Sequence, residues 1–306
     1  MSGRRHLLSP EAVARLANLD LIAHHVVEGF FAGLHRSPYH GFSSEFSQHR
    51  PYSPGDDLRK IDWGVWGRTD RLFVKQFEEE TNLNAMILLD LSHSMAYPGK
   101  GGNAGGGIDK SFYSRALAAS LTHLLLRQRD AVGLMLFSDR VVRIVAPSSR
   151  SSHRRVLLTL LEGAEPHARR TDVPGALHRA AERMRRRGLV ILLSDLQACD
   201  ATSVEHGLRH LRHRGHAVLA IRVLHPSELE LDLSGDVILK DLETGRVVAT
   251  HGIEARRAIR ARQAERTRQW ISLFGAAGAD FSTLTTDQPF DLALGALLRR
   301  RVRSGP

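Results

Sequence analysis

Three oxygen-bearing side chains occupy alternate positions in the segment Asp90-Leu91-Ser92-His93-Ser94. The apolar residues 85–89 precede them without a charge, which predicts a strand buried on both faces, as in a parallel sheet. Open α/β sheets bind ligands at the carboxyl ends of such strands. A carboxylate and two hydroxyls are hard donors, so this loop favours Mg²⁺ over Zn²⁺, which prefers nitrogen and sulfur. The pattern therefore predicts a metal-binding loop.

Two further segments supply oxygen donors that this loop lacks. The apolar residues 189–193 predict a second buried strand, which Ser194 and Asp195 follow, and Thr171 stands at the amino end of an expected helix. We expect the three segments to converge at one end of the sheet. Mg²⁺ is the expected ion, with Mn²⁺ and Ca²⁺ as alternatives. The candidate metal ligands are Asp90, Ser92, Ser94, Thr171 and Asp195.

Strand and helix patterns alternate after residue 84, which predicts an α/β fold with a mostly parallel sheet and helices on both faces. Only residues 138–140 separate two of the strands, so we expect these to pair as a hairpin at the sheet edge. A second hairpin is expected as an insertion near residues 236–250. The expected strands are 85–89, 131–137, 141–145, 189–193, 217–224 and 281–284, and the expected helices are 111–128, 151–162, 173–187, 203–213, 254–274 and a last one from Pro289.

The N-terminal part has a different pattern. Residues 1–80 are expected to form a small α+β subdomain ahead of the main domain over residues 81–306. Ser9-Pro10-Glu11 is a typical helix start, with a hydroxyl cap, a proline at the first helical position and an acid that the helix dipole favours. The helix should run towards Leu34, with a break near residues 19–20.

The order and spacing of the candidate ligands resemble the metal-ion-dependent adhesion site (MIDAS) of von Willebrand factor A domains. There, Asp-x-Ser-x-Ser, a threonine and an aspartate hold one Mg²⁺. The resemblance implies a von Willebrand factor A-like, Rossmann-like fold in which the hydroxyls bind the ion directly, the aspartates often act through water, and a partner's acidic side chain fills an open position. We therefore expect a metal-dependent protein–protein interaction module rather than an enzyme. Where that family usually has glycines before the threonine, this chain has Arg169 and Arg170, which leaves Asp172 as an alternative to Thr171.

Residues 50–63 (RPYSPGDDLRKIDW) and 72–80 (LFVKQFEEE) resemble the hallmark of a bacterial family known as domain of unknown function 58. The resemblance covers nearly the whole chain and implies a von Willebrand factor A-like domain. It also implies that the protein is a partner or adaptor of a MoxR-type AAA+ ATPase, binding the ATPase or its client. Within the hallmark, we expect an ion-pair cluster with Trp63 and Trp66 packed beneath it, and a docking surface for the ATPase is the alternative.

Composition is ordinary for a folded protein: of 306 residues, 42% are apolar and 25% are charged. Cys199 is the only cysteine, so no internal disulfide and no thiol-rich metal site can form. No run approaches the roughly 20 apolar residues of a membrane span. Glu11 and Asp20 interrupt any signal-peptide core. We therefore expect a cytoplasmic protein.

Two other function classes are alternatives. The net charge of +10 suggests a basic nucleic-acid-binding protein, but aromatic residues make up only 6% and do not interleave with the arginines. A strand-end aspartate with Mg²⁺ also serves a hydrolase or a phosphoryl-transfer enzyme. Aspartyl phosphatases, however, place a second carboxylate two residues further on, where this chain has Ser92.

Two further motifs carry no binding prediction. A phosphate loop is excluded in the glycine-rich residues 99–107, because Asp109 and Ala104 stand where its two glycines are required. A zinc site is disfavoured on the helical face that carries three histidines, since arginines flank them and no glutamate or cysteine completes the set. These histidines are His206, His210 and His213.

Overall fold

A computed structural model of the chain describes residues 10–16, 18–34, 49–51, 67, 72–75, 83–98, 108–197, 199–229, 235–240 and 247–303. The chain divides into two compact units. Residues 1–30 and 82–306 form the first unit, and residues 31–81 form the second. The first unit contains every candidate metal ligand.

A six-stranded sheet lies at the centre of the first unit. Its strands are β3 (Asn84–Asp90), β4 (Ala131–Phe137), β5 (Val141–Ser148), β6 (Gly188–Ser194), β7 (Ala217–Leu224) and β10 (Asp280–Thr285). They lie in the order β10-β7-β6-β3-β4-β5. Neighbours are parallel except β4 and β5, which pair antiparallel at one edge. The predicted edge hairpin is therefore confirmed.

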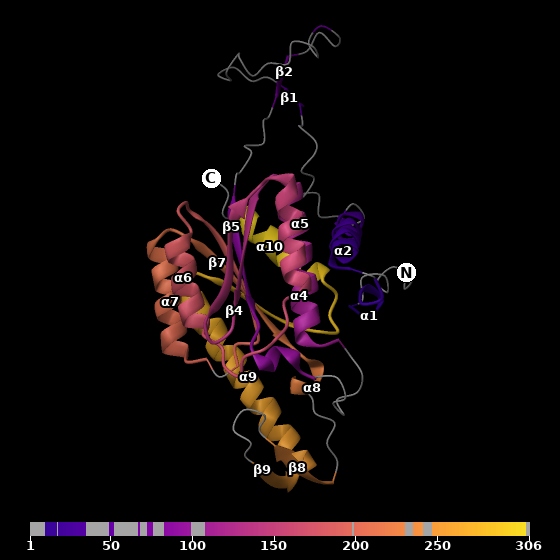
Figure 1. The fold of residues 1–306 in the computed structure, drawn as a ribbon, viewed down its shortest axis with the longest axis vertical. Coiled ribbons are helices and arrows are strands. Elements are labelled where there is room, and N and C mark those ends of the chain that lie inside the picture. The colour runs from indigo at the N-terminus through magenta and orange to yellow at the C-terminus, as the bar shows by residue number, and fades with distance from the viewer. Residues whose placement is uncertain are drawn as a thin grey trace. The chain divides into compact units, whose positions relative to one another are not determined.

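Helices cover both faces of this sheet. They are α4 (Lys110–Arg127), α5 (Ser151–Glu162), α6 (Val173–Arg183), α7 (Ala201–His213), α9 (Gly252–Ala276) and α10 (Asp291–Arg303). On one face, α6, α7 and α9 pack in one core against every second residue of β3, β4, β6 and β7. Helices α4, α5 and α10 lie on the other face (Figure 1). The predicted α/β fold, with a mostly parallel sheet between two helical layers, is confirmed.

The two central strands and α4 explain why the chain folds around this sheet. All of β6 and all but the first residue of β3 are buried, as expected for strands covered on both faces. Asp109 caps α4 by accepting a hydrogen bond from the Phe112 amide at 2.6 Å. Most of the surface of α4 consists of its own small residues and leucines, which are buried. The helix therefore packs closely against the sheet and α5.

Two separate helices, α1 (Pro10–Val13) and α2 (Leu19–Leu34), replace the single interrupted helix expected at the N-terminus. The break comes slightly earlier than predicted, because Asn18 caps α2 by accepting a hydrogen bond from the Leu21 amide at 2.9 Å. The two expected helical segments are therefore present, and the break between them lies before residue 19 rather than at residues 19–20.

Helix α2 packs against α4 and α5, so the division of the chain differs from the predicted boundary at residue 80. The rings of His24 and His123 meet edge to face with centroids 5.6 Å apart. Glu28 pairs with Arg127, and Asp20 pairs with Arg154. These contacts explain why residues 1–30 belong with the sheet rather than with an N-terminal subdomain.

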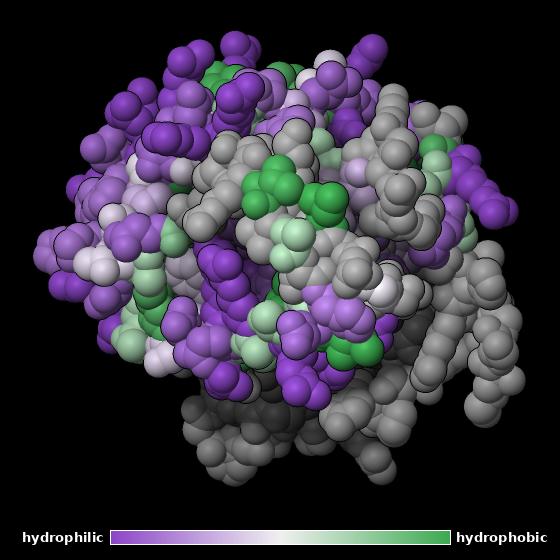
Figure 2. Space-filling view, turned by 90° about the horizontal axis from the view of Figure 1, so that it is seen from below, coloured by the Kyte–Doolittle hydropathy of each residue, from purple (hydrophilic) through white to green (hydrophobic). Residues whose placement is uncertain are grey.

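A second hairpin interrupts the first unit where an insertion was predicted. Strand β8 (Asp236–Lys240) pairs antiparallel with β9 (Val247–His251), and α9 follows directly. Figure 2, viewed from the side of this hairpin, shows apolar residues among hydrophilic ones. Exposed apolar side chains here are Ile238, Val247 and Ile253, with 75%, 57% and 61% of their surface accessible.

In the second unit, the structure describes a small antiparallel pair, β1 (His49–Pro51) and β2 (Phe73–Lys75), in which Arg50 faces Val74. Most of the hallmark segment, including Trp63 and Trp66, lies outside the described residues, as does the glycine-rich run 99–107. Among the described helices, none combines the length and apolar character needed to cross a lipid bilayer.

Candidate metal centre

The carboxyl ends of β3 and β6 bring two of the three predicted segments together. These strands are parallel neighbours in which Leu89 faces Leu193, so Asp90 and Ser194 come next to each other at the sheet edge. The Ser194 hydroxyl donates a hydrogen bond to Asp90 Oδ2 at 2.6 Å. Since Asp195 follows directly, both predicted carboxylates lie at this edge.

The third segment reaches the same edge by running beside the loop after β3. Ser92 forms a parallel β-bridge with Ala168, and the His93 amide donates to the Ala168 carbonyl at 2.6 Å. This pairing carries Thr171 to the end of β3, where its hydroxyl donates to Asp90 Oδ2 at 2.9 Å. The expected convergence of the three segments is thus observed.

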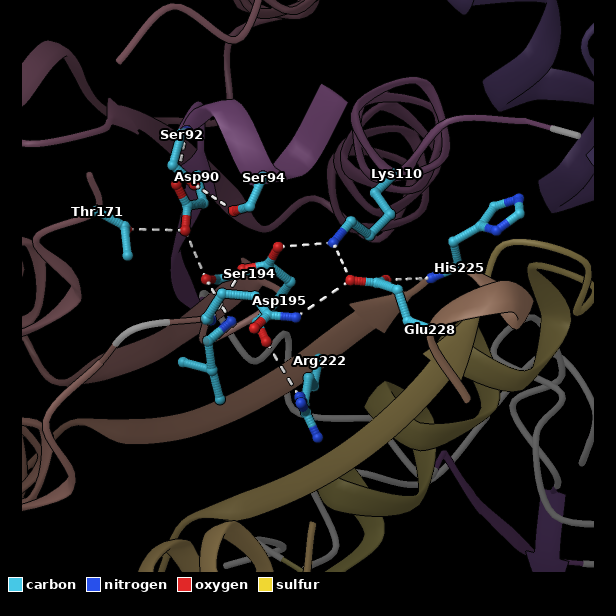
Figure 3. A network of polar contacts seen from close by, with 12 residues as sticks. Asp90, Ser92, Ser94, Lys110, Thr171, Ser194, Asp195, Arg222, His225 and Glu228 are labelled. Atoms are coloured by element: carbon cyan, nitrogen blue, oxygen red, sulfur yellow. Dashed lines mark hydrogen bonds and ion pairs between the residues drawn. The ribbon is translucent and has the colours of Figure 1, made fainter. Parts of the chain in front are cut away.

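The loop after β3 folds its oxygen donors towards one another. The Ser92 amide donates to Asp90 Oδ1 at 2.9 Å, and the hydroxyl oxygens of Ser92 and Ser94 lie 3.2 Å apart. The Ser94 side chain helps to lower the pKa of Asp195. Figure 3 shows Ser92, Ser94 and Thr171 around Asp90, with Asp195 beside Ser194 on the side of Lys110. Asp90, Ser92 and Asp195 are buried, whereas Ser94 and Thr171 are partly exposed, so the cluster opens towards solvent on their side.

The alternative ligand Asp172 has a different role. Its carboxylate caps α6 by accepting a hydrogen bond from the Gly175 amide at 2.9 Å. Its neighbour Thr171, by contrast, faces Asp90. Of the two residues that the sequence left open, the structure therefore brings Thr171 to the candidate site.

Three polar residues at this edge were absent from the predicted ligand set: Ser194, Lys110 and Glu228. The Lys110 ammonium lies 2.7 Å from Asp195 Oδ2 and 2.8 Å from Glu228 Oε1 (Figure 3). Glu228 belongs to the short helix α8 (Pro226–Leu229), which follows β7. Ser194 could have been found as a hydroxyl at a strand end, but no sequence signal marked Lys110 or Glu228 as neighbours of the site.

The pKa values of the two aspartates in the cluster are shifted in opposite directions. Burial, and then the nearby Asp195 carboxylate, raises the pKa of Asp90 to about 6. Burial also opposes ionisation of Asp195, but the Lys110 ammonium together with hydrogen bonds from Lys110 and the Gln197 amide holds the pKa of Asp195 below its usual range. Lys110 thus compensates the charge of Asp195, whereas Asp90 takes up a proton more readily than an ordinary aspartate.

The donor set fits a hard divalent cation. It consists of carboxylate and hydroxyl oxygens, which Mg²⁺ and Mn²⁺ accept and Zn²⁺ disfavours. The candidate site combines two aspartates with three hydroxyls. Within the described part of the chain, no metal site made of three or more histidine, cysteine, aspartate or glutamate side chains is present. On α7, His206 and His213 are exposed, and His210 contacts His178, with their Nδ1 atoms 2.9 Å apart.

Comparison with known proteins identifies the family. Residues 48–270, well over half of the chain, match the family described as "Protein of unknown function DUF58". The chain belongs to the DUF58 family. A relative that matches most of the chain is "Uncharacterized protein Rv1480" of Mycobacterium tuberculosis (strain ATCC 25618 / H37Rv), which is 30% identical over 298 residues. That alignment covers 95% of this chain and 91% of the relative.

Solved structures similar to this DUF58 chain include the conserved hypothetical protein BatB from Bacteroides thetaiotaomicron. It shares 14% identity, with a TM-score of 0.45 and coverage of 72% of this chain and 99% of that one. The VWA domain of SpRpn10 is also similar, at 11% identity and a TM-score of 0.38, with 68% of this chain and 92% of that one covered.

Proposed function

We propose that this protein is a metal-dependent protein–protein interaction module that captures a partner carboxylate through a bound Mg²⁺. The observation that carries the proposal is the convergence of oxygen donors from three distant segments around the end of β3. Thr171 and Ser194 both donate to the carboxylate of Asp90, and the Ser92 and Ser94 hydroxyls lie beside it. Such a cluster is expected where a small cation is to be surrounded by hard donors.

The residues that would hold the ion are the five predicted ligands. The hydroxyls of Ser92, Ser94 and Thr171 add no charge, and Lys110 already compensates the carboxylate of Asp195. A divalent ion at this edge would therefore share the carboxylate charge with Lys110. When bound, it supplies an electrophilic position that attracts an acidic side chain from outside. The partly exposed side of the cluster gives such a side chain access.

The expected partner is a MoxR-type AAA+ ATPase or a client of that ATPase. Support comes from membership of the DUF58 family, for which the hallmark resemblance implies such a partnership. A carboxylate on the surface of the partner would complete the ion's coordination, so association should depend on the metal.

The decisive experiment compares the wild type with Asp90→Asn. This substitution removes the charge at the centre of the cluster but keeps an oxygen that can accept hydrogen bonds from Thr171 and Ser194. Calorimetry with MgCl₂ and MnCl₂ should show binding to the wild type and a loss of at least about tenfold in affinity for the variant. Asp139→Asn is the matched control, because Asp139 is an exposed carboxylate in the turn after β4.

A pull-down from the source cell should give the corresponding result for the partner. Capture is expected in Mg²⁺ and should be lost in EDTA and with Asp90→Asn, while Asp139→Asn keeps it. Partner capture that persists in EDTA and with Asp90→Asn would contradict the proposed role of the metal. Turnover of a phosphoester that disappears in Asp90→Asn would instead support a Mg²⁺-dependent enzyme.

A further inference from the structure

Lys110 is unusual because its charged end is completely enclosed next to the proposed metal ligands. Neither its side chain nor that of Asp195 has any accessible surface. Asp109 caps α4 and thereby starts the helix at Lys110, which directs the lysine towards the end of β6. A buried ammonium is costly unless it is paired, so its position depends on the two carboxylates that it contacts.

The surroundings hold this arrangement in place. Glu228 accepts hydrogen bonds from the His225 amide at 2.7 Å and from the Gln197 side chain at 3.1 Å. Asp195 Oδ1 accepts from the Gln197 amide at 2.9 Å, while its Oδ2 accepts from Lys110. Both oxygens of Asp195 thus already have donors within the protein. Because a carboxylate has about four lone-pair sites, a metal ion at Asp195 would share its negative charge with these donors.

We propose that Lys110 is an internal counter-cation that lowers the affinity of the site for a divalent metal. This inference rests on the proposed function and adds how that site is regulated. The ammonium of Lys110 and a metal ion compete for the negative charge of Asp195, and the two cations repel each other. Lys110 acts through Asp195 and is therefore a positioning residue rather than a metal ligand.

The consequence is that metal and partner bind together. In the absence of the partner, Lys110 offsets part of the negative charge that Asp90, Asp195 and Glu228 offer a divalent cation. A partner carboxylate supplies the missing charge and increases the affinity for the ion. By linkage, the ion increases the affinity for the partner by the same factor. A site of this kind stays weakly loaded until an acidic partner arrives.

The test compares substitutions of the two partners in the ion pair between Lys110 and Glu228. Lys110→Met removes the counter-cation, and calorimetry with MgCl₂ and MnCl₂ should show about tenfold tighter binding than in the wild type. Glu228→Gln keeps the Lys110–Asp195 pair but removes one negative charge, so the affinity should fall by a few-fold. A purely structural role for this cluster would not raise metal affinity in Lys110→Met.

A control and a second measurement keep the test decisive. Arg266→Met removes a neighbouring positive charge that donates to the Leu196 carbonyl at 3.3 Å but does not contact Asp195, so metal affinity should change little. Lys110→Met leaves a buried carboxylate unpaired, so its melting temperature should fall without metal and rise more with MgCl₂ than that of the wild type. If Lys110→Met does not fold, unchanged or tighter metal binding by Glu228→Gln overturns the inference.

The outcomes separate this inference from the proposed function. If the wild type binds the metal and Lys110→Met binds it equally or more weakly, the inference is wrong and the metal-dependent function stands. If only Lys110→Met binds the metal, Lys110 has displaced the ion in the wild type, so the inference stands and the proposed function fails. If no variant binds either ion, both fail.

Discussion

Thr171 and Asp172 are adjacent in sequence, but their side chains serve different parts of the structure. Thr171 donates to the carboxylate of Asp90, whereas Asp172 caps α6 through the Gly175 amide. A hydroxyl contributes to a metal site without adding charge, while a capping carboxylate stabilises a helix terminus. The division explains how one short segment can begin a helix and still contribute to the candidate metal centre.

This division predicts that one substitution lowers the metal affinity and the other lowers the stability of the fold. Thr171→Val should reduce Mg²⁺ affinity by about tenfold and leave the fold intact, since valine keeps the shape but lacks the hydroxyl. Asp172→Ala should lower the free energy of unfolding by about 1 kcal/mol through loss of the cap, with Mg²⁺ affinity close to that of the wild type. Calorimetry and urea unfolding measure the two effects. Loss of metal binding in Asp172→Ala alone would make Asp172 the ligand.

At the scale of elements, the contact between α2 and α4 depends on an uncharged histidine. Burial, and then the nearby Arg154 guanidinium, lowers the pKa of His123 to about 4, well below its ordinary value of 6.5. Because the folded state resists protonation, the unfolded chain binds this proton first as the pH falls. The stabilisation is complete above pH 6.5 and is lost progressively towards pH 4.

Urea unfolding between pH 7 and pH 4 should reveal this loss. The contribution of His123 is roughly 1 kcal/mol, once solvent screening at this half-buried position is allowed for. His123→Gln should remove that part of the pH dependence. His206→Gln, on the exposed side of α7, should leave the pH dependence as in the wild type. An equally steep loss of stability in His123→Gln would show that other groups cause the acid sensitivity.

At the scale of the whole first unit, Arg222 connects the candidate metal centre to α9. Its side chain is completely buried, and its Nε donates to the Asp195 carbonyl at 3.0 Å. The same guanidinium donates to Thr267 at 3.1 Å and to Gln263 at 2.9 Å, both on α9. One side chain therefore joins the loop after β6 to the helix that follows the inserted hairpin.

Arg222→Met should loosen this connection. The substitution roughly preserves the volume but leaves buried acceptors unpaired, at an expected cost of roughly 2–3 kcal/mol in the free energy of unfolding. Hydrogen exchange should become faster in the loop after β6 and in the part of α9 around Gln263. Arg209→Met is the matched control, since Arg209 is exposed and pairs only with Glu205 on its own helix in the contacts described. Equal exchange in both variants would refute the connection.

Local patterns in the sequence were sufficient to predict the α/β architecture and the candidate ligands. Apolar runs such as residues 189–193 predict strands covered on both faces, because only such strands lack exposed polar positions. Oxygen donors that follow these runs must lie at the same end of the sheet, because the carboxyl ends of parallel strands lie side by side. The convergence of Asp90 and Asp195 follows from this topology, whereas Thr171 arrives through the bridge between Ser92 and Ala168. Binding of Mg²⁺ by these residues stays a prediction.

The electrostatic environment of these residues was decided only by the tertiary structure. Lys110 is separated from Asp195 by 85 positions and from Glu228 by 118, so no local pattern could pair them. The pair forms because α4, β6 and α8 meet at one edge of the sheet and exclude water from the charges they bring together. Periodicity along the chain reports which side chains are buried, whereas the charge that each buried group experiences depends on neighbours that only packing supplies.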